Sequence, residues 1–162
     1  MKKHKGLIIA GVVLAALVAY CLWYTLVPKS WANISGAGQI NSLSWSIYYD
    51  DGKLQGHSTD RLKVQGTHPA AQAVISALEN HTYRADLVNL NPIPQDPDHV
   101  PGVDILSLMM YTPEKLITVD IRSNGQFYTD TLSSSPRCYS YQTDTGLFQE
   151  VLDIFQKYGI SE

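Results

Sequence analysis

The order of apolar and charged positions divides the chain into an uncharged N-terminal run and a longer segment of mixed polarity. Residues 6–27 contain no charged side chain. At about 1.5 Å per residue, a helix of this length matches the hydrocarbon core of a bilayer, which is about 30 Å thick. Lys2, Lys3 and Lys5 precede the run, whereas only Lys29 follows it closely. The pattern predicts a single transmembrane signal-anchor helix over residues 6–27.

The charge asymmetry around the run indicates its orientation. Lys and Arg are enriched at the cytoplasmic end of membrane helices. We therefore expect residues 1–5 in the cytoplasm and residues 30–162 outside it, in a single-pass protein of the cell membrane. Trp23 and Tyr24 lie near the outer end of the run, and aromatic side chains favour the membrane interface.

Two other uses of the N-terminal run stay open. One is a cleaved signal peptide, because Ser30 and Ala32 supply the small side chains needed for a cut before Asn33. The apolar region of a signal peptide usually has only about 7–15 residues, however, which is shorter than this run. The other is a lipoprotein anchored through Cys21, but Tyr20 stands where such an anchor needs a small residue. The membrane anchor is the preferred interpretation.

Beyond the run, a segment rich in Ser, Gly and Asn leads into the domain, and we expect residues 28–43 to form a linker. The domain is then expected to span residues 44–162 and to lie outside the cytoplasm. Alternating apolar and polar side chains over residues 44–49 predict its first strand. Residues 61–65 are expected to return as a second strand.

Two segments have the period of an amphipathic helix. Pro69 suits a first helical position with Thr67 or His68 as the cap, and apolar side chains then recur on one face, at Ala71, Val74, Ile75 and Leu78. A final helix is expected to begin at residues 143–146. Its apolar face comprises Leu147, Phe148, Val151, Leu152, Phe155 and Tyr158.

The C-terminal half has the pattern of an antiparallel β-meander. Strands are expected at residues 103–111, 116–122, 126–132 and 137–142. Asn124-Gly125 indicates a type I′ hairpin turn between the second and third of them. Residues 83–90 predict an additional, earlier strand. Runs of strands with helices at their ends predict the α+β class, with one antiparallel sheet and both helices packed on one of its faces.

Charge and motifs limit the function. Residues 30–162 carry eight basic and fifteen acidic side chains, a net charge of −7, against −3 for the whole chain. An acidic domain repels phosphate backbones and anionic lipid headgroups, so neither nucleic acid nor a peripheral membrane-binding face is expected. The sequence contains no P-loop, nucleophile elbow, dinucleotide fingerprint or H-E-x-x-H motif. We expect no cofactor and assign no catalytic residue.

The proline-rich loop at residues 91–102 is the predicted binding element. It is interpreted as joining two strands that need only a short turn to pair, so that its length exceeds what connectivity requires. Four prolines reduce the entropy lost when the loop docks. The predicted contacts are Gln95, Asp96, Asp98 and His99.

Metal binding has weaker support. Asp96, Asp98 and His99, with Asp104 nearby, offer oxygen ligands of the kind that calcium accepts. The loop lacks the ordered alternation of ligands found in an EF-hand, and no two histidines have the close helical spacing typical of transition-metal sites. No metal site is assigned.

The lone cysteine and several tyrosines of the domain are interpreted as packing residues. Cys138 is expected on the packed side of its strand, opposite to its tyrosine neighbours, as a small apolar side chain. Tyr128, Tyr139 and Tyr141 are expected to share one sheet face with Tyr111 or Met110, as a layer on which the helices pack. The alternative is an exposed aromatic stripe that stacks on sugar rings or binds a peptide.

These observations predict a membrane-anchored, extracytoplasmic and non-catalytic module that binds a protein or a component of the cell envelope. The short Lys-rich start and the compact domain are typical of bacteria. The alternative is a small envelope hydrolase with an unfamiliar site around His57, Asp60, His99 and Asp104. A third interpretation is an accessory subunit that acts through its anchor helix, although Gly6 and Gly11 do not have the G-x-x-x-G spacing of a helix-packing face.

Overall fold

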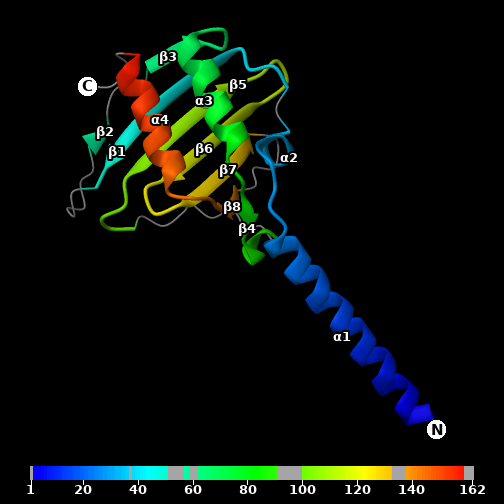
Figure 1. Cartoon of the computed structure of the whole chain (residues 1–162). Coiled ribbons are helices and arrows are strands. Elements are labelled where there is room, and N and C mark those ends of the chain that lie inside the picture. The colour runs from blue at the N-terminus through cyan, green and yellow to red at the C-terminus, as the bar shows by residue number, and fades with distance from the viewer. Residues whose placement is uncertain are drawn as a thin grey trace.

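A long helix projects from a two-layer domain (Figure 1). The computed structural model describes residues 2–36, 38–50, 57–58, 62–90, 100–132 and 138–158. Helix α1 spans Lys2–Leu26, and the short helix α2 spans Trp31–Ser35. The helices of the domain are α3, Pro69–Asn80, the 3-10 helix η1, Leu87–Leu90, and α4, Gly146–Lys157.

The strands form one sheet in which every pairing is antiparallel. They are β1 Ser42–Tyr49, β2 His57–Ser58, β3 Leu62–Gln65, β4 Arg84–Ala85, β5 Ile105–Tyr111, β6 Leu116–Arg122, β7 Gln126–Leu132 and β8 Cys138–Gln142. Their order across the sheet is β2-β1-β5-β6-β7-β8-β4, with β3 also paired to β1. The chain therefore belongs to the predicted α+β class, and β5 to β8 form the predicted meander.

The meander follows directly from alternation in the sequence. In β6, Ile117, Val119 and Ile121 are each no more than 1% exposed, while Thr118 and Asp120 between them point to the other face and are half-buried. Register places Val119 between Leu108 of β5 and Thr129 of β7. A period of two thus defines one buried face across neighbouring strands.

The turn between β6 and β7 is not the type I′ turn predicted from the sequence. Gly125 has a φ of +86°, but no residue other than glycine has a positive φ among those described, so Asn124 cannot have the conformation that type I′ needs. The N–H of Gly125 donates to the carbonyl of Arg122 at 3.0 Å. The loop is therefore a three-residue turn with glycine at its left-handed position, a common alternative for closing a hairpin.

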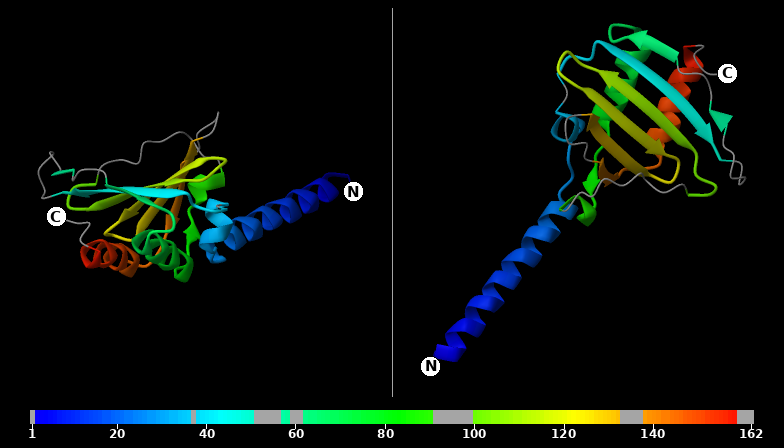
Figure 2. Two further views of the ribbon diagram at one scale, coloured as in Figure 1. Left: turned by 90° about the horizontal axis from the view of Figure 1, so that it is seen from above. Right: turned by 180° about the vertical axis from the view of Figure 1, so that it is seen from behind.

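Both long helices of the domain lie on the same side of the sheet (Figure 2). Helix α3 begins as predicted, because His68 caps it and accepts a hydrogen bond from the Ala70 N–H at 3.2 Å, with Pro69 following. Helix α4 buries four of its predicted apolar residues, namely Leu147, Phe148, Val151 and Phe155. The ring of Phe155 stacks on that of Trp45 with centroids 4.4 Å apart, and this contact joins α4 to β1.

Only part of the strand predicted over residues 83–90 exists. Strand β4 has two residues, and η1 follows it. Two polar side chains explain the change. The Asn89 amide donates to the Ser140 carbonyl at 2.6 Å and accepts from the Ser140 N–H at 2.8 Å. The side chain thus makes the two hydrogen bonds that the backbone of a neighbouring strand would make at the edge of β8. The N–H of Asp86 also donates to the Ser140 carbonyl. Side-chain hydrogen bonds therefore end the strand locally.

The segment that the sequence places in a linker, residues 28–43, contributes to the packed domain. Residues 31–35 form α2, and Trp31 is only 3% exposed. Its ring lies against Phe127 and Tyr83, with centroid distances of 6.2 and 6.5 Å. Strand β1 also begins within this segment, at Ser42.

Candidate functional site

The face of the sheet opposite α3 and α4 carries a continuous row of polar side chains, which we call the polar row. Alternation directs one residue from each of five adjacent strands to this face, and antiparallel register aligns them. The row runs through Ser46, Ser107, Asp120, Tyr128 and Ser140. Each of these side chains is half-buried.

The polar row is ordered by hydrogen bonds. The Ser107 hydroxyl donates to the Asp120 carboxylate, and at the far end the Ser140 hydroxyl donates to Asp86. The guanidinium of Arg122 lies 4.6 Å from the centroid of the Tyr128 ring. Such an arrangement presents oriented donors and acceptors and an aromatic ring, which is the chemistry of a binding surface.

Arg122 is the most deeply buried charged residue on this side of the sheet. It is 2% exposed, and its Nη1 donates to the side-chain oxygen of Gln126 at 3.2 Å. Because its guanidinium is held between Gln126 and the Tyr128 ring, the positive charge is fixed beside the polar row rather than extended into solvent.

A second row on the same face lies two residues away along each strand. It comprises Ser44, Met109, Thr118, Asp130 and Cys138. The Tyr111 hydroxyl approaches the Met109 sulfur at 4.0 Å. This row therefore mixes the hydroxyl and carboxylate groups of Ser44, Thr118 and Asp130 with the softer, sulfur-bearing side chains of Met109 and Cys138.

The placement of Cys138 contradicts the sequence prediction. On β8, Tyr141 is 5% exposed and belongs to the hydrophobic core, and Tyr139 packs against that core. Strand alternation then places half-buried Cys138 on the face opposite the helices. The prediction failed because the aromatic residues of this strand lie on one face and the small apolar Cys138 on the other. Burying the aromatic side chains removes more apolar area from water, so packing favours their face.

The predicted tyrosine layer is also divided between two faces. Tyr139 and Tyr141 belong to the helix-covered side, whereas Tyr128 belongs to the polar row. Tyr111 is the last residue of β5. Alternation along this strand places it on the same face as Ser107, which belongs to the polar row with Tyr128. The sequence offers no signal for this division, because it depends on the register between strands.

The predicted binding residues Gln95, Asp96, Asp98 and His99 lie outside the described residues. The end of their loop is described from Val100 onward. The Gly102 N–H donates to the Asp50 carboxylate at 2.8 Å, and the Asp104 carboxylate accepts from the Asp50 N–H at 3.0 Å. The Asp104 N–H in turn donates to the Ser123 hydroxyl at 3.0 Å.

The length of the loop has a structural cause that the sequence prediction missed. Strands β4 and β5 are not neighbours, because β8, β7 and β6 lie between them. At about 4.8 Å per strand, the chain has to cross about 19 Å, which needs roughly six extended residues. The interpretation that a short turn would connect these strands is therefore wrong, and loop length no longer supports a binding role.

The alternative hydrolase site is only partly described. Asp60 and His99 lie outside the described residues, and for His57 only the backbone is described. Register pairs His57 with Tyr49, next to Asp50, whose N–H binds Asp104. The fold thus brings His57 and Asp104 to the same end of the sheet. Among the described residues, no group of three or more His, Cys, Asp or Glu side chains is arranged to hold a metal ion.

A cluster that sequence reasoning missed joins the two long helices. His81, which follows α3, places Nδ1 2.6 Å from the Asp144 carboxylate and Nε2 2.9 Å from the Glu150 carboxylate. Both ring nitrogens donate only when the imidazole is protonated. Burial lowers the pKa of His81, but the hydrogen bonds to Glu150 and Asp144 outweigh it and raise that pKa above its usual 6.5. His81 is 63 positions from Asp144 and 69 from Glu150, so no local pattern indicates that the three residues meet.

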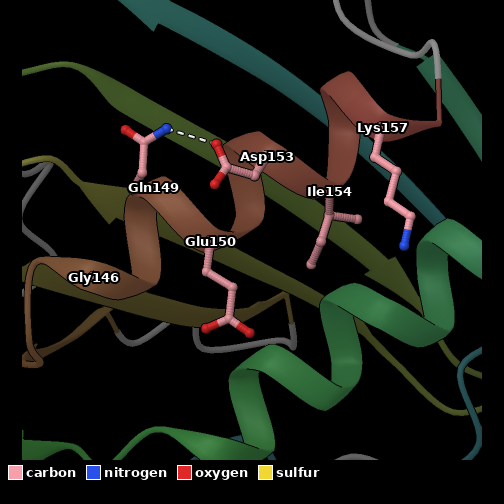
Figure 3. A pocket seen from close by; sticks show the side chains of 6 residues that line it. All are labelled: Gly146, Gln149, Glu150, Asp153, Ile154 and Lys157. Atoms are coloured by element: carbon pink, nitrogen blue, oxygen red, sulfur yellow. Dashed lines mark hydrogen bonds between the residues drawn. The ribbon is translucent and has the colours of Figure 1, made fainter.

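An open depression beside this cluster runs along α4. It is lined by Gly146, Gln149, Glu150, Asp153, Ile154 and Lys157. Figure 3 shows that Glu150, Ile154 and Lys157 point toward α3, whereas Gln149 and Asp153 lie on the other side of α4 and share a hydrogen bond of 2.7 Å. The residues that line the depression all belong to α4, so the depression lacks convergent groups from several elements.

No family model, curated protein or solved structure matches the chain.

Proposed function

We propose that the protein is a membrane-anchored, extracytoplasmic binding module of the bacterial cell envelope and that it acts without catalysis. Within α1, residues Ile9–Leu26 have a mean hydropathy of 2.1 and none of them is buried in the protein. An apolar helix that the domain leaves uncovered requires another apolar environment, and a bilayer supplies it. Lys2, Lys3 and Lys5 support a cytoplasmic N-terminus.

The packing of Trp31 supports retention of the anchor. Cleavage before Asn33 would remove this side chain from a core in which it is 3% exposed. Loss of a buried Trp typically costs about 3–5 kcal/mol. A mature domain starting at Asn33 would therefore be substantially less stable than the intact chain.

The observation that carries the binding proposal is the polar row. Its hydroxyl, carboxylate and phenol groups come from five strands, so the sheet holds them in fixed relative positions. A rigid surface loses little entropy when a ligand binds. The partner is a protein or an envelope component that forms hydrogen bonds, and the acidic charge of the domain disfavours nucleic acid. Gln95, Asp96, Asp98 and His99 remain proposed contacts.

Site-specific photo-crosslinking in intact cells tests the proposal. A benzophenone amino acid replaces Tyr128 in the full-length protein, and in a control variant it replaces Ser76, which is exposed on α3. We expect a discrete crosslinked product from position 128 and none from position 76. Equal crosslinking from the two positions, or none from position 128, would contradict a binding site on the polar row.

The loop contacts need a variant that preserves the connection between β4 and β5. A short turn cannot cross the intervening strands, so the four proposed residues are instead replaced by Gly or Ser at constant loop length. We expect the crosslink from position 128 to weaken while the fold is kept. An unchanged crosslink would assign binding to the sheet face alone.

A further inference from the structure

Exposed large apolar side chains are concentrated at one end of the molecule. Among the side chains that the structure describes, they lie in α1 and at Val27, with one exception. The exception is Leu87, which is 57% exposed. Single exposed apolar residues are ordinary on protein surfaces, so its location decides whether it has a role.

Leu87 lies beside the end of the anchor helix. It belongs to η1, and both η1 and the preceding strand β4 contact α1. Figure 1 shows β4 next to the domain end of α1. The apolar window of α1 extends to Leu26, so this edge of the domain is at the level where the helix would leave the bilayer.

The connection between α1 and the domain is short and fixed. Lys29 and Tyr83 exchange two backbone hydrogen bonds of 2.7 and 3.0 Å. Two residues later, Trp31 is buried against Tyr83 and Phe127. The β4 edge is therefore held against the end of α1 and cannot swing away without breaking core contacts.

Although the domain as a whole is acidic, the polar groups described at this edge suit a lipid headgroup layer. Arg84 is exposed, and the Lys29 ammonium lies 4.3 Å from the centroid of the Tyr24 ring. Asp86, the nearby carboxylate, accepts a hydrogen bond from Ser140 and so is turned toward β8. Cations beside exposed aromatic and aliphatic side chains are typical of the membrane interface.

We propose that the edge formed by β4 and η1 is a membrane-contacting surface, in which Leu87 enters the boundary between headgroups and acyl chains. The inference rests on the proposed membrane anchoring by α1. It adds that the domain is seated on the bilayer in one orientation, with the C-terminal end of α4 directed away from α1 (Figure 1). The domain is thus positioned by the anchor rather than suspended from a flexible tether.

Fluorescence quenching in vesicles tests the seating. The full-length protein, with Cys21→Ala and Cys138→Ala, carries Leu87→Cys labelled with an environment-sensitive dye and is reconstituted into phosphatidylcholine and phosphatidylglycerol vesicles. The control is Gln156→Cys, an exposed position near the far end of α4. We expect lipids with a nitroxide near the headgroup to quench the dye at position 87 at least about twofold more than at position 156. Equal quenching would overturn the proposal.

Two further variants separate the possible failures. A dye at Leu17→Cys is expected near the middle of the bilayer and is therefore read with lipids that carry the nitroxide near the end of the acyl chain. It reports on α1 itself, so an unquenched signal there would contradict the anchoring and the seating together. Quenching at position 17 with none at position 87 would overturn the seating alone. A Gly-Ser-Gly-Ser insertion between Val27 and Pro28 is expected to reduce quenching at position 87 to the control value. Persistent quenching would mean that the domain binds lipid without α1 and would refute positioning by the anchor.

Discussion

Close contacts around single residues determine several features of the fold. Gly125 has a φ of +86°, and a Cβ added there would lie 2.8 Å from the Thr143 carbonyl oxygen. We expect Gly125→Ala to lower the free energy of unfolding by about 2–3 kcal/mol, because the energetic costs of the strained backbone and of the close contact add. Urea denaturation of the full-length protein in detergent, followed by near-ultraviolet circular dichroism, measures the loss.

Gly102 provides the matched control. It also has a positive φ, +78°, but a Cβ added there would meet nothing within 4 Å. Gly102→Ala is therefore expected to cost only about 1 kcal/mol, from the backbone conformation alone. Equal losses for the two variants would show that the contact with Thr143 contributes nothing.

His81 gives the stability of the protein a defined pH dependence. Its pKa is raised in the folded protein, so its contribution is fully present below the unfolded pKa of about 6.5 and is lost as pH rises through the folded pKa. Burial raises the pKa of Asp144, but the hydrogen bond from His81 outweighs it and keeps that pKa below 3.8. The contribution of Asp144 is therefore lost only as pH falls through this lower value. We expect stability to decrease above neutral pH by about 1 kcal/mol.

His81→Gln tests the origin of this decrease. Glutamine retains one hydrogen-bond donor group but does not titrate, so the fall in unfolding free energy above neutral pH should disappear. Glu150→Gln should reduce the fall without removing it, because Asp144 still faces the ring. Denaturation midpoints between pH 5 and pH 9 distinguish these variants, and an unchanged profile for His81→Gln would assign the effect to another group.

At the scale of elements, the edge of the sheet depends on one side chain. Asn89 is 6% exposed and satisfies both backbone groups of Ser140 on β8. We expect Asn89→Ala to cost about 2–3 kcal/mol, because two partly buried hydrogen bonds are lost and the Ser140 N–H is left without its acceptor. Hydrogen exchange should accelerate first at β8 and be measurable by mass spectrometry.

Asn124→Ala is the control for this prediction. Asn124 also makes two side-chain hydrogen bonds, both to Gln126, but they are exposed. Water replaces such bonds readily, so a loss below about 1 kcal/mol is expected. A comparable effect of the two substitutions would argue that burial at the β8 edge is unimportant.

The elements differ in how far the sequence predicts them. The bounds of β6 and β7 agree with prediction because a period of two fixes their faces within seven residues. The Pro69 start of α3 also agrees, since its cap is local. Strand β4 was predicted too long because Asp86 and Asn89 bind a distant strand, and such contacts leave no periodic signal.

At the scale of the whole molecule, the charge asymmetry predicts the topology. Spheroplasts carrying the protein with a tag at each terminus are treated with protease. We expect the C-terminal tag to be digested and the N-terminal tag to stay protected until the membrane is lysed, because three lysines favour a cytoplasmic N-terminus. The reverse pattern of protection would refute the orientation. N-terminal sequencing of the recovered protein would detect any cut before Asn33.

The sequence by itself determined the apolar N-terminal helix, the α+β class and most of the meander, because each depends on the side-chain pattern within a short segment. The tertiary structure decided the remaining features. Register between strands aligned the polar row and placed Cys138 opposite the core, and strand order explained the loop between β4 and β5. The His81 cluster and the backbone pairing of Lys29 with Tyr83, which holds the domain at the end of α1, likewise join residues far apart in the chain. Local patterns specify which face of an element is apolar, but only the packed chain specifies which elements meet.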